Sequence, residues 1–261
     1  MKGNEIKMGI INRQIPITIS NSDCTWNSFE KSITVKGDIS GTIPTEELGI
    51  KNIDSCPIIT DKSTGTLMPQ DISVLLKQPF KVFITNYADG KYVFSRKAYL
   101  EYCKDELVVG EIYKAVVYGI CAWGIFCKIG DAIVLVHITN WSRCRFYNAR
   151  SISYPGQIIK VKILSKKKDV DGSIRVVASR KDVESNVFFI PGEEVIVTLS
   201  RKTCTGDGFF CELTPDTCGI VDVYPEDIPY LIDGMRVVAV VKKCSPKGYK
   251  LRYSHLFRGN Y

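Results

Sequence analysis

One plan of short apolar stretches returns three times along this chain, and an internal repeat restricts the possible folds more than any other feature of a sequence. In the middle copy, five stretches have the length and the apolar–polar alternation of β-strands. A long polar and aromatic connection, residues 139–154, follows the third of them. Five short strands in about 70 residues predict a small barrel. The five stretches are residues 110–121, 123–130, 133–138, 157–164 and 173–179.

The same plan recurs on both sides of the middle copy. In the C-terminal copy, residues 233–241 repeat the pattern of residues 155–163. In the looser N-terminal copy, residues 33–44 align with residues 126–137, and residues 49–68 form a long polar insertion. The sequence therefore predicts an all-β chain of tandem five-stranded barrels with the oligonucleotide-binding (OB) fold. The expected domains are residues 1–98, 109–181 and 187–256.

Short helical linkers are expected between the barrels. Residues 98–107 read as a short helix that joins the first and second copies. Residues 182–186 are expected to do the same between the second and third copies.

The positive charge of the chain is concentrated in its middle third. The net formal charge is +7, and residues 110–182 carry 13 Lys and Arg against 5 Asp and Glu, while the flanking thirds are close to neutral. Such a local excess is expected at a binding site for a polyanion. A solvated basic surface without a partner would give the same count, so charge alone leaves both interpretations open.

Cysteine and histidine usage argues against a metal site. Ten cysteines are spread along the chain without a C-x-x-C pair, and there are only two histidines. Structural zinc needs closely spaced Cys and His ligands, so no metal is expected. The cysteines are expected to be free thiols in the reducing cytosol.

The sequence also lacks the signatures of common enzymes. It has no Walker-type phosphate loop, no G-x-S-x-G and no H-E-x-x-H. Asp169 and Asp171 lie close together, but a turn beside a lysine run accounts for them. There is no secretory signal and no apolar stretch of the roughly 18 residues that a membrane span needs. We therefore expect a cytoplasmic protein with no membrane contact and no cofactor, and not an enzyme.

The middle copy has an ordered set of motifs. It runs G-E-x-Y, then W-G-I-F, then V-L-V-H-I-T-N-W-S, then Y-P-G-Q, and ends on I-R-V-V-A-S-R-K. This order resembles the S-one RNA-binding repeat, which is named for the largest protein of the small ribosomal subunit. The resemblance extends over most of the chain in three copies, as in small S-one-like proteins of bacteria. It implies OB-fold barrels and binding of RNA.

In that family, RNA lies across an aromatic and basic face of the barrel. Trp123 and Phe126 flank a glycine at the start of a strand, where two exposed rings can stack on unpaired bases. His137 could stack or donate a hydrogen bond, and the cationic side chains could pair with phosphates. The resemblance implies the RNA-binding residues Trp123, Phe126, His137, Arg143, Arg145, Lys160, Lys162 and Arg175.

These residues also have purely structural interpretations. A Trp and a Phe in a barrel are often core residues, His137 could be a structural histidine, and Arg143 and Arg145 could be ordinary surface charges. Trp141 could fold either inward or over the RNA face.

The outer copies depart from the motif. In the third copy, Asp207 and Asp222 stand at the first aromatic position and at the histidine position. In the first copy, Glu30, Ile33 and Pro44 stand at the two aromatic positions and at the histidine position. Acidic groups repel phosphates. We therefore expect the outer copies to bind RNA weakly and to dock on protein, such as the ribosome, or to extend the scaffold.

Taken together, the sequence predicts non-catalytic binding of single-stranded RNA, such as mRNA, in translation. The small ribosomal subunit is a second candidate partner. Two alternatives stay open: a protein-interaction scaffold whose basic patch is incidental, and a regulatory subunit of an RNA-processing complex.

Overall fold

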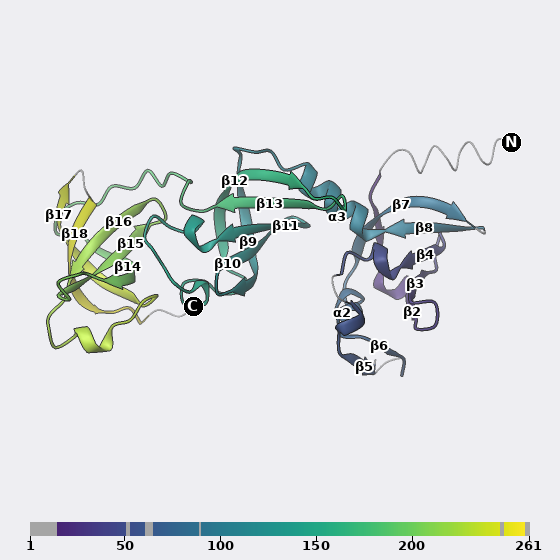
Figure 1. Ribbon diagram of the computed structural model, residues 1–261, viewed down its shortest axis with the longest axis horizontal. Helices are drawn as coiled ribbons and strands as arrows, with labels where there is room; N and C mark the ends of the chain where they lie inside the picture. The colour runs from purple at the N-terminus through teal and green to yellow at the C-terminus, as the bar shows by residue number, and fades with distance from the viewer. Residues whose placement is uncertain (1–14, 51–52, 61–64, 89, 246–247, 259–261) are drawn as a thin grey trace. The chain divides into compact units, whose positions relative to one another are not determined.

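The computed structural model separates into two compact units, residues 1–103 and 104–261. Strands dominate both units in Figure 1, which confirms the all-β prediction. Among the residues that the structure describes, no helix is long and apolar enough to cross a membrane. The described residues are 15–50, 53–60, 65–88, 90–245 and 248–258.

The middle copy forms a closed five-stranded barrel in the order β10-β11-β13-β12-β9. Neighbouring strands are antiparallel except β11 and β13, which are parallel. Every second side chain of a strand points into the barrel. On β11, Ala132, Val134 and Val136 are buried, and the residues between them are half-exposed. The strands are β9 (Ile112–Cys121), β10 (Gly124–Ile129), β11 (Ala132–His137), β12 (Ile158–Lys168) and β13 (Ile174–Ser179), with the 3₁₀ turns η4 (Ile138–Asn140) and η5 (Ala149–Ser151).

The third copy repeats this topology as a closed barrel in the order β14-β15-β16-β18-β17. Its parallel pair is β16 and β18, the equivalents of β11 and β13. Phe209, Cys211 and Leu251 are among the buried residues that fill it. The elements are β14 (Glu194–Lys202), β15 (Gly208–Thr214), β16 (Thr217–Asp222), η6 (Ile228–Tyr230), β17 (Arg236–Ser245) and β18 (Gly248–Leu256).

The first copy is a six-stranded sheet in the order β1-β7-β8-β4-β3-β2. Its first strand is divided, because β1 pairs with β7 whereas β2 pairs with β3. Together β1 and β2 take the place of β9, which pairs with strands on both sides. Sequence patterning gave no sign of this division. The elements are β1 (Ile17–Ile19), η1 (Asn21–Asp23), β2 (Cys24–Asn27), β3 (Ser32–Val35), β4 (Gly41–Pro44), η2 (Thr45–Glu47), β7 (Phe80–Ala88) and β8 (Lys91–Ser95).

The insertion in the first copy is partly apolar. Strand β5 (Ile58–Thr60) pairs with β6 (Leu67–Pro69), and helix α2 (Gln70–Leu75) follows directly. Met68 and Ile72 are buried in the core of the first unit. The end of the insertion is therefore attached to the sheet by apolar contacts. A further 3₁₀ turn is η3 (Ile53–Ser55).

One of the two predicted helical linkers is present. Helix α3 (Arg96–Asp105) follows the first copy, as predicted. Between the second and third copies, the chain forms a turn and then irregular backbone, so the prediction of a helix there is wrong. Ser185 explains the difference, because its backbone N and its Oγ donate hydrogen bonds of 3.1 and 2.6 Å to the carboxylate of Asp216. These bonds attach the linker to the third barrel, and the next residue, Asn186, has a left-handed φ of 47°, which a helix does not allow.

The loop after β11 packs on the third barrel, so the two barrels of the second unit share an interface. The backbone N of Arg143 donates to the carbonyl of Pro215 at 2.9 Å. The Ser200 Oγ donates to the carbonyl of Arg145. Cys144, between these two anchor points, is buried. The course of this loop is therefore fixed by residues more than fifty positions away.

Candidate nucleic-acid interface

Three predicted rings gather where β10 begins and β11 ends. Trp123 directly precedes β10 and is 50% exposed. Its ring centroid lies 6.1 Å from that of Phe126, in an edge-on arrangement, and 6.2 Å from that of His137. The rings come together because Gly124 of β10 pairs with His137 of β11. We call Trp123, Phe126 and His137 the ring platform.

Gly124 allows this close grouping. A Cβ atom at Gly124 would lie 3.0 Å from Leu135 Cδ1 and 3.3 Å from the carbonyl oxygen of Val136. A larger residue would therefore have to displace the Leu135 side chain and would crowd the backbone of β11 where the platform is assembled. The glycine is thus explained by packing.

His137 has a fixed orientation. Its Nδ1 accepts a hydrogen bond from the backbone N of Thr139 at 3.3 Å and lies 2.8 Å from the Thr139 Oγ1. Because Nδ1 acts as an acceptor, the proton of the neutral ring is assigned to Nε2. The ring therefore offers a donor at Nε2.

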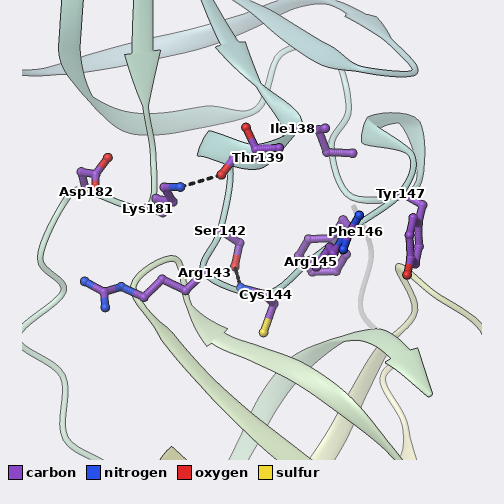
Figure 2. A pocket seen from close by; sticks show the side chains of 10 residues that line it. All are labelled: Ile138, Thr139, Ser142, Arg143, Cys144, Arg145, Phe146, Tyr147, Lys181 and Asp182. Carbon is purple, nitrogen blue, oxygen red and sulfur yellow. Dashed lines mark hydrogen bonds between the residues drawn. The ribbon is translucent and has the colours of Figure 1, made fainter. Parts of the chain in front are cut away.

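The loop arginines lie beside a cleft of about 620 Å³. Figure 2 shows Arg143 and Arg145 along one loop, with the sulfur of Cys144 between them pointing toward strands of the third barrel. Lys181 closes the cleft and donates a 2.7 Å hydrogen bond to the carbonyl of Thr139. The side chains of Arg143 and Arg145 are exposed. Both cations are thus accessible at the junction of the two barrels.

The other predicted cations lie on different strands from the platform. Lys160, which is exposed, and Lys162, which is half-buried, are on β12. Lys160 pairs with Lys114 of β9, so β9 lies between it and β10. Arg175 of β13 is 2.9 Å from Asp169, which already neutralises part of its charge. These cations add to the positive field of the barrel, but the structure does not bring them into the ring platform.

Trp141 folds inward. It is 1% exposed, and the guanidinium of Arg180 lies 4.5 Å from its ring centroid. Of the two orientations left open by the sequence, the structure shows the buried one.

Two exposed aromatic residues of this barrel, Tyr118 and Tyr147, were not among the predicted site residues. Tyr118 on β9 is 59% exposed, and Lys128 Nζ lies 4.3 Å from its ring centroid. Tyr147, in the loop after β11, is 61% exposed, and its ring centroid lies 5.7 Å from the Cζ atom of Arg145. No sequence signal pointed to Tyr118, because its exposure depends on how β9 pairs with β10.

In the third barrel, carboxylates replace two of the platform rings. Gly208 pairs with Asp222 as Gly124 pairs with His137, which places Asp207 at the position of Trp123. Asp222 forms an ion pair with Lys250 at 3.2 Å. Hydrogen bonds from Thr205 and Thr203 lower the pKa of Asp207, so it is a stable anion. This face is therefore less attractive to phosphates.

The register of the first copy differs by one residue from the predicted alignment. Pro44 precedes a 3₁₀ turn, as His137 does, but it pairs with Ser32. Ser32 is therefore the equivalent of Gly124, and the aromatic positions fall on Lys31 and Thr34. The assignment of those positions to Glu30 and Ile33 is corrected, since Ile33 is fully buried in the core. The equivalents of the platform, Lys31, Thr34 and Pro44, contain no aromatic ring.

Asp169 and Asp171 stabilise a turn, as their sequence context predicts. Asp171 accepts a 2.7 Å hydrogen bond from the Ser173 Oγ, and Asp169 is paired with Arg175. Across the described part of the chain, there is no group of three or more Cys, His, Asp or Glu side chains that could hold a metal ion.

The three curated proteins that match this chain are all the small ribosomal subunit protein bS1. The chain is 23% identical over 218 residues to the small ribosomal subunit protein bS1 of Rhizobium meliloti, which covers 76% of this chain and 38% of that protein. It is 26% identical over 207 residues to bS1 of Streptococcus pneumoniae, covering 74% of this chain and 50% of that protein. The chain is similar in sequence to ribosomal protein bS1. The predicted resemblance to the S-one family is thereby confirmed.

The similarity to bS1 is partial. The chain spans between about a quarter and a half of the length of the bS1 proteins that it matches, at 27%, 38% and 50%. No family model matches it. A multidomain protein with nucleic acid binding domains from Streptococcus pneumoniae is 12% identical with a TM-score of 0.33, covering 94% of this chain and 74% of that one. The protein GSP13 of Bacillus subtilis is 21% identical with a TM-score of 0.27, covering 33% of this chain and 67% of that one.

Proposed function

We propose that this chain is a non-catalytic protein that binds single-stranded RNA through its middle barrel. The observation that carries the proposal is the ring platform. Trp123 is half-exposed, and two further rings lie within 6.2 Å of it on a barrel with a strong excess of positive charge. Exposed aromatic rings beside cations are what unpaired bases and their phosphates require.

The proposed mechanism combines stacking with charge. Each base that stacks on Trp123 or Phe126 would contribute about 1–3 kcal/mol. His137 would donate from Nε2 to a base or sugar, and the guanidinium groups of Arg143 and Arg145 would pair with phosphates. Lys160, Lys162 and Arg175 would act at longer range, because they lie away from the platform.

The similarity to bS1 favours mRNA as the RNA and the small ribosomal subunit as a second partner. Under this proposal the protein acts in translation in the cytoplasm. The alternatives are a scaffold that binds only protein and a regulatory subunit of an RNA-processing complex. Co-purification with ribosomes would support the role in translation, whereas co-purification with a nuclease would support the regulatory subunit.

The test is fluorescence anisotropy with a labelled single-stranded RNA of about 12 nucleotides, long enough to fill one barrel site. Wild type is compared with the Trp123→Ala/Phe126→Ala variant at two salt concentrations, with duplex DNA as the competitor. We expect a preference for the single strand, weaker binding at higher salt because counterions are released, and a loss of about 2 kcal/mol or more in the variant. A Tyr230→Ala variant, which removes an exposed ring of the third barrel, is the control.

Two results would count against the proposal. One is equal affinity of wild type for the single strand and for duplex DNA. The other is unchanged RNA affinity in a double variant that retains the wild-type circular dichroism spectrum. Either would favour the protein-binding scaffold.

A further inference from the structure

We infer that Tyr118 provides a further base-stacking position, on β9 beside Phe126. This inference rests on the proposed function, since it extends the RNA site across a neighbouring strand. Tyr118 lies outside the motifs that the chain shares with the S-one repeat, so the argument comes from the geometry of the barrel.

A bulge turns Tyr118 toward the outer face. Phe126 pairs with Gly119, and the next residue, Cys127, pairs with Val117, so Tyr118 is an extra residue on β9. Cys127 and Val117 are buried in the barrel. The extra residue lets two successive residues of one strand lie opposite a single residue of its partner. Tyr118 and Gly119 therefore both lie on the outer side, opposite Phe126.

Gly119 leaves space beside the platform. A Cβ atom built there would have no heavy atom within 4 Å. The outer surface at Gly119, opposite Phe126, is thus open, and Tyr118 beside it is 59% exposed. No side chain at position 119 would therefore block a base that lies on the exposed Tyr118.

Lys128 supplies a cation at this position. It follows Phe126 by two residues on the same face of β10, a separation of roughly 7 Å along the strand. Its Nζ lies 4.3 Å from the centroid of the Tyr118 ring, within the range of a cation–π interaction. The pair therefore combines a ring for a base with a charge for the adjoining phosphate. An RNA strand leaving Trp123 past Phe126 would meet this pair next.

The experiment compares two RNA lengths. Anisotropy is measured with labelled oligouridylates of about three nucleotides, enough for the ring platform, and about eight nucleotides, enough to reach β9. The variants are Tyr118→Ala and Tyr118→Phe, with Tyr230→Ala as the matched control and Trp123→Ala/Phe126→Ala as the platform variant. We expect Tyr118→Ala to weaken binding of the longer RNA about tenfold and binding of the shorter RNA less than twofold, whereas Tyr118→Phe keeps both affinities.

The outcomes separate the two proposals. If Tyr118→Ala binds both RNAs as wild type does while the platform variant loses both, the Tyr118 position is overturned and the proposed function stands. If neither variant loses affinity, the RNA site itself is misplaced and both proposals fail. Thermal unfolding of each variant shows whether a loss of binding reflects a loss of folding.

Discussion

Arg180 Nη1 lies 2.9 Å from Glu212 Oε1, and this ion pair joins the end of the middle barrel to β15 of the third. The side chains are only 16% and 8% exposed. Arg180 also covers the ring of Trp141, which belongs to the loop that packs against the third barrel. One arginine thus connects the linker, the loop and the neighbouring barrel.

Loss of this arginine should destabilise the second unit strongly. Arg180→Met leaves the Glu212 carboxylate buried without its partner, and its Oε2 already lacks a hydrogen bond. Breaking a buried pair in this way costs about 3–5 kcal/mol. The free energy of unfolding is measured by urea titration. The Arg180→Met/Glu212→Leu double variant should recover much of the loss, and a double variant as unstable as the single one would contradict this explanation.

RNA binding should quench the fluorescence of one tryptophan. Trp123 is 50% exposed, whereas Trp26 and Trp141 are 7% and 1% exposed. Bases that stack on Trp123 should quench it, so Trp123→Phe should abolish most of the RNA-dependent change. Trp141→Phe is the control and should retain it. Quenching that persists in Trp123→Phe would place the bases elsewhere.

Stability should fall at acid pH through Asp216. Burial opposes ionisation of this carboxylate, but hydrogen bonds from Ser185 and Thr214 lower its pKa to about 2. A carboxylate with a lowered pKa stabilises the fold above its unfolded pKa of about 3.9 and loses that contribution as the pH falls toward 2. Asp216→Asn should therefore remove about 1 kcal/mol at pH 7, a figure discounted for its partial exposure.

The check is the melting temperature as a function of pH. The difference between wild type and Asp216→Asn should be largest near neutral pH and should shrink between pH 4 and pH 2. A difference that does not change over this range would show that the linker bonds do not depend on the charge of Asp216.

Two thiols at the barrel junction should differ in reactivity. Cys144 Sγ lies 2.7 Å from Cys218 Sγ, and the hydrogen bond from Cys144 lowers the pKa of Cys218. The same contact, together with burial, raises the pKa of Cys144. Burial also raises the pKa of Cys127 to about 12. Iodoacetamide should therefore alkylate Cys218 before its neighbour Cys144, and also before Cys127 of β10, at every pH below about 12.

Mass spectrometry of peptides gives the pH profile of alkylation for each thiol. Cys144→Ala should move the midpoint of the Cys218 profile to higher pH, whereas a change in access alone would alter only the plateau rate. An unmoved midpoint would mean that Cys144 does not stabilise the Cys218 thiolate.

The sequence was most informative where structure is local. Alternation along residues 132–137 predicts a strand, and the position of a glycine opposite His137 brings Trp123 and the histidine together across one hairpin. Such contacts depend on strand period and pairing, which are visible in a single sequence. The arrangement of the platform rings could therefore be predicted, although their role in RNA binding remains a prediction.

The remaining features depend on distant residues. The linker between the second and third copies is held by Asp216, and the course of the loop after β11 is set by Pro215 and Ser200. In the first copy, residues 36–40 connect β3 to β4, whereas only residues 130–131 connect β10 to β11. This longer connection hid the one-residue shift in register. The bulge at Tyr118 likewise appears only when pairing with β10 is known.

The packing of the middle loop on the third barrel limits how the chain can be divided. A fragment ending at residue 181 would remove the third-barrel residues that contact the buried Cys144, and would leave Arg180 without its carboxylate. In truncated variants, a loss of binding or stability would therefore reflect the disrupted interface as well as the missing repeat. Point substitutions in the intact chain avoid this confusion. The last two repeats are thus one structural unit, since each supplies hydrogen-bond and ion-pair partners that the other buries.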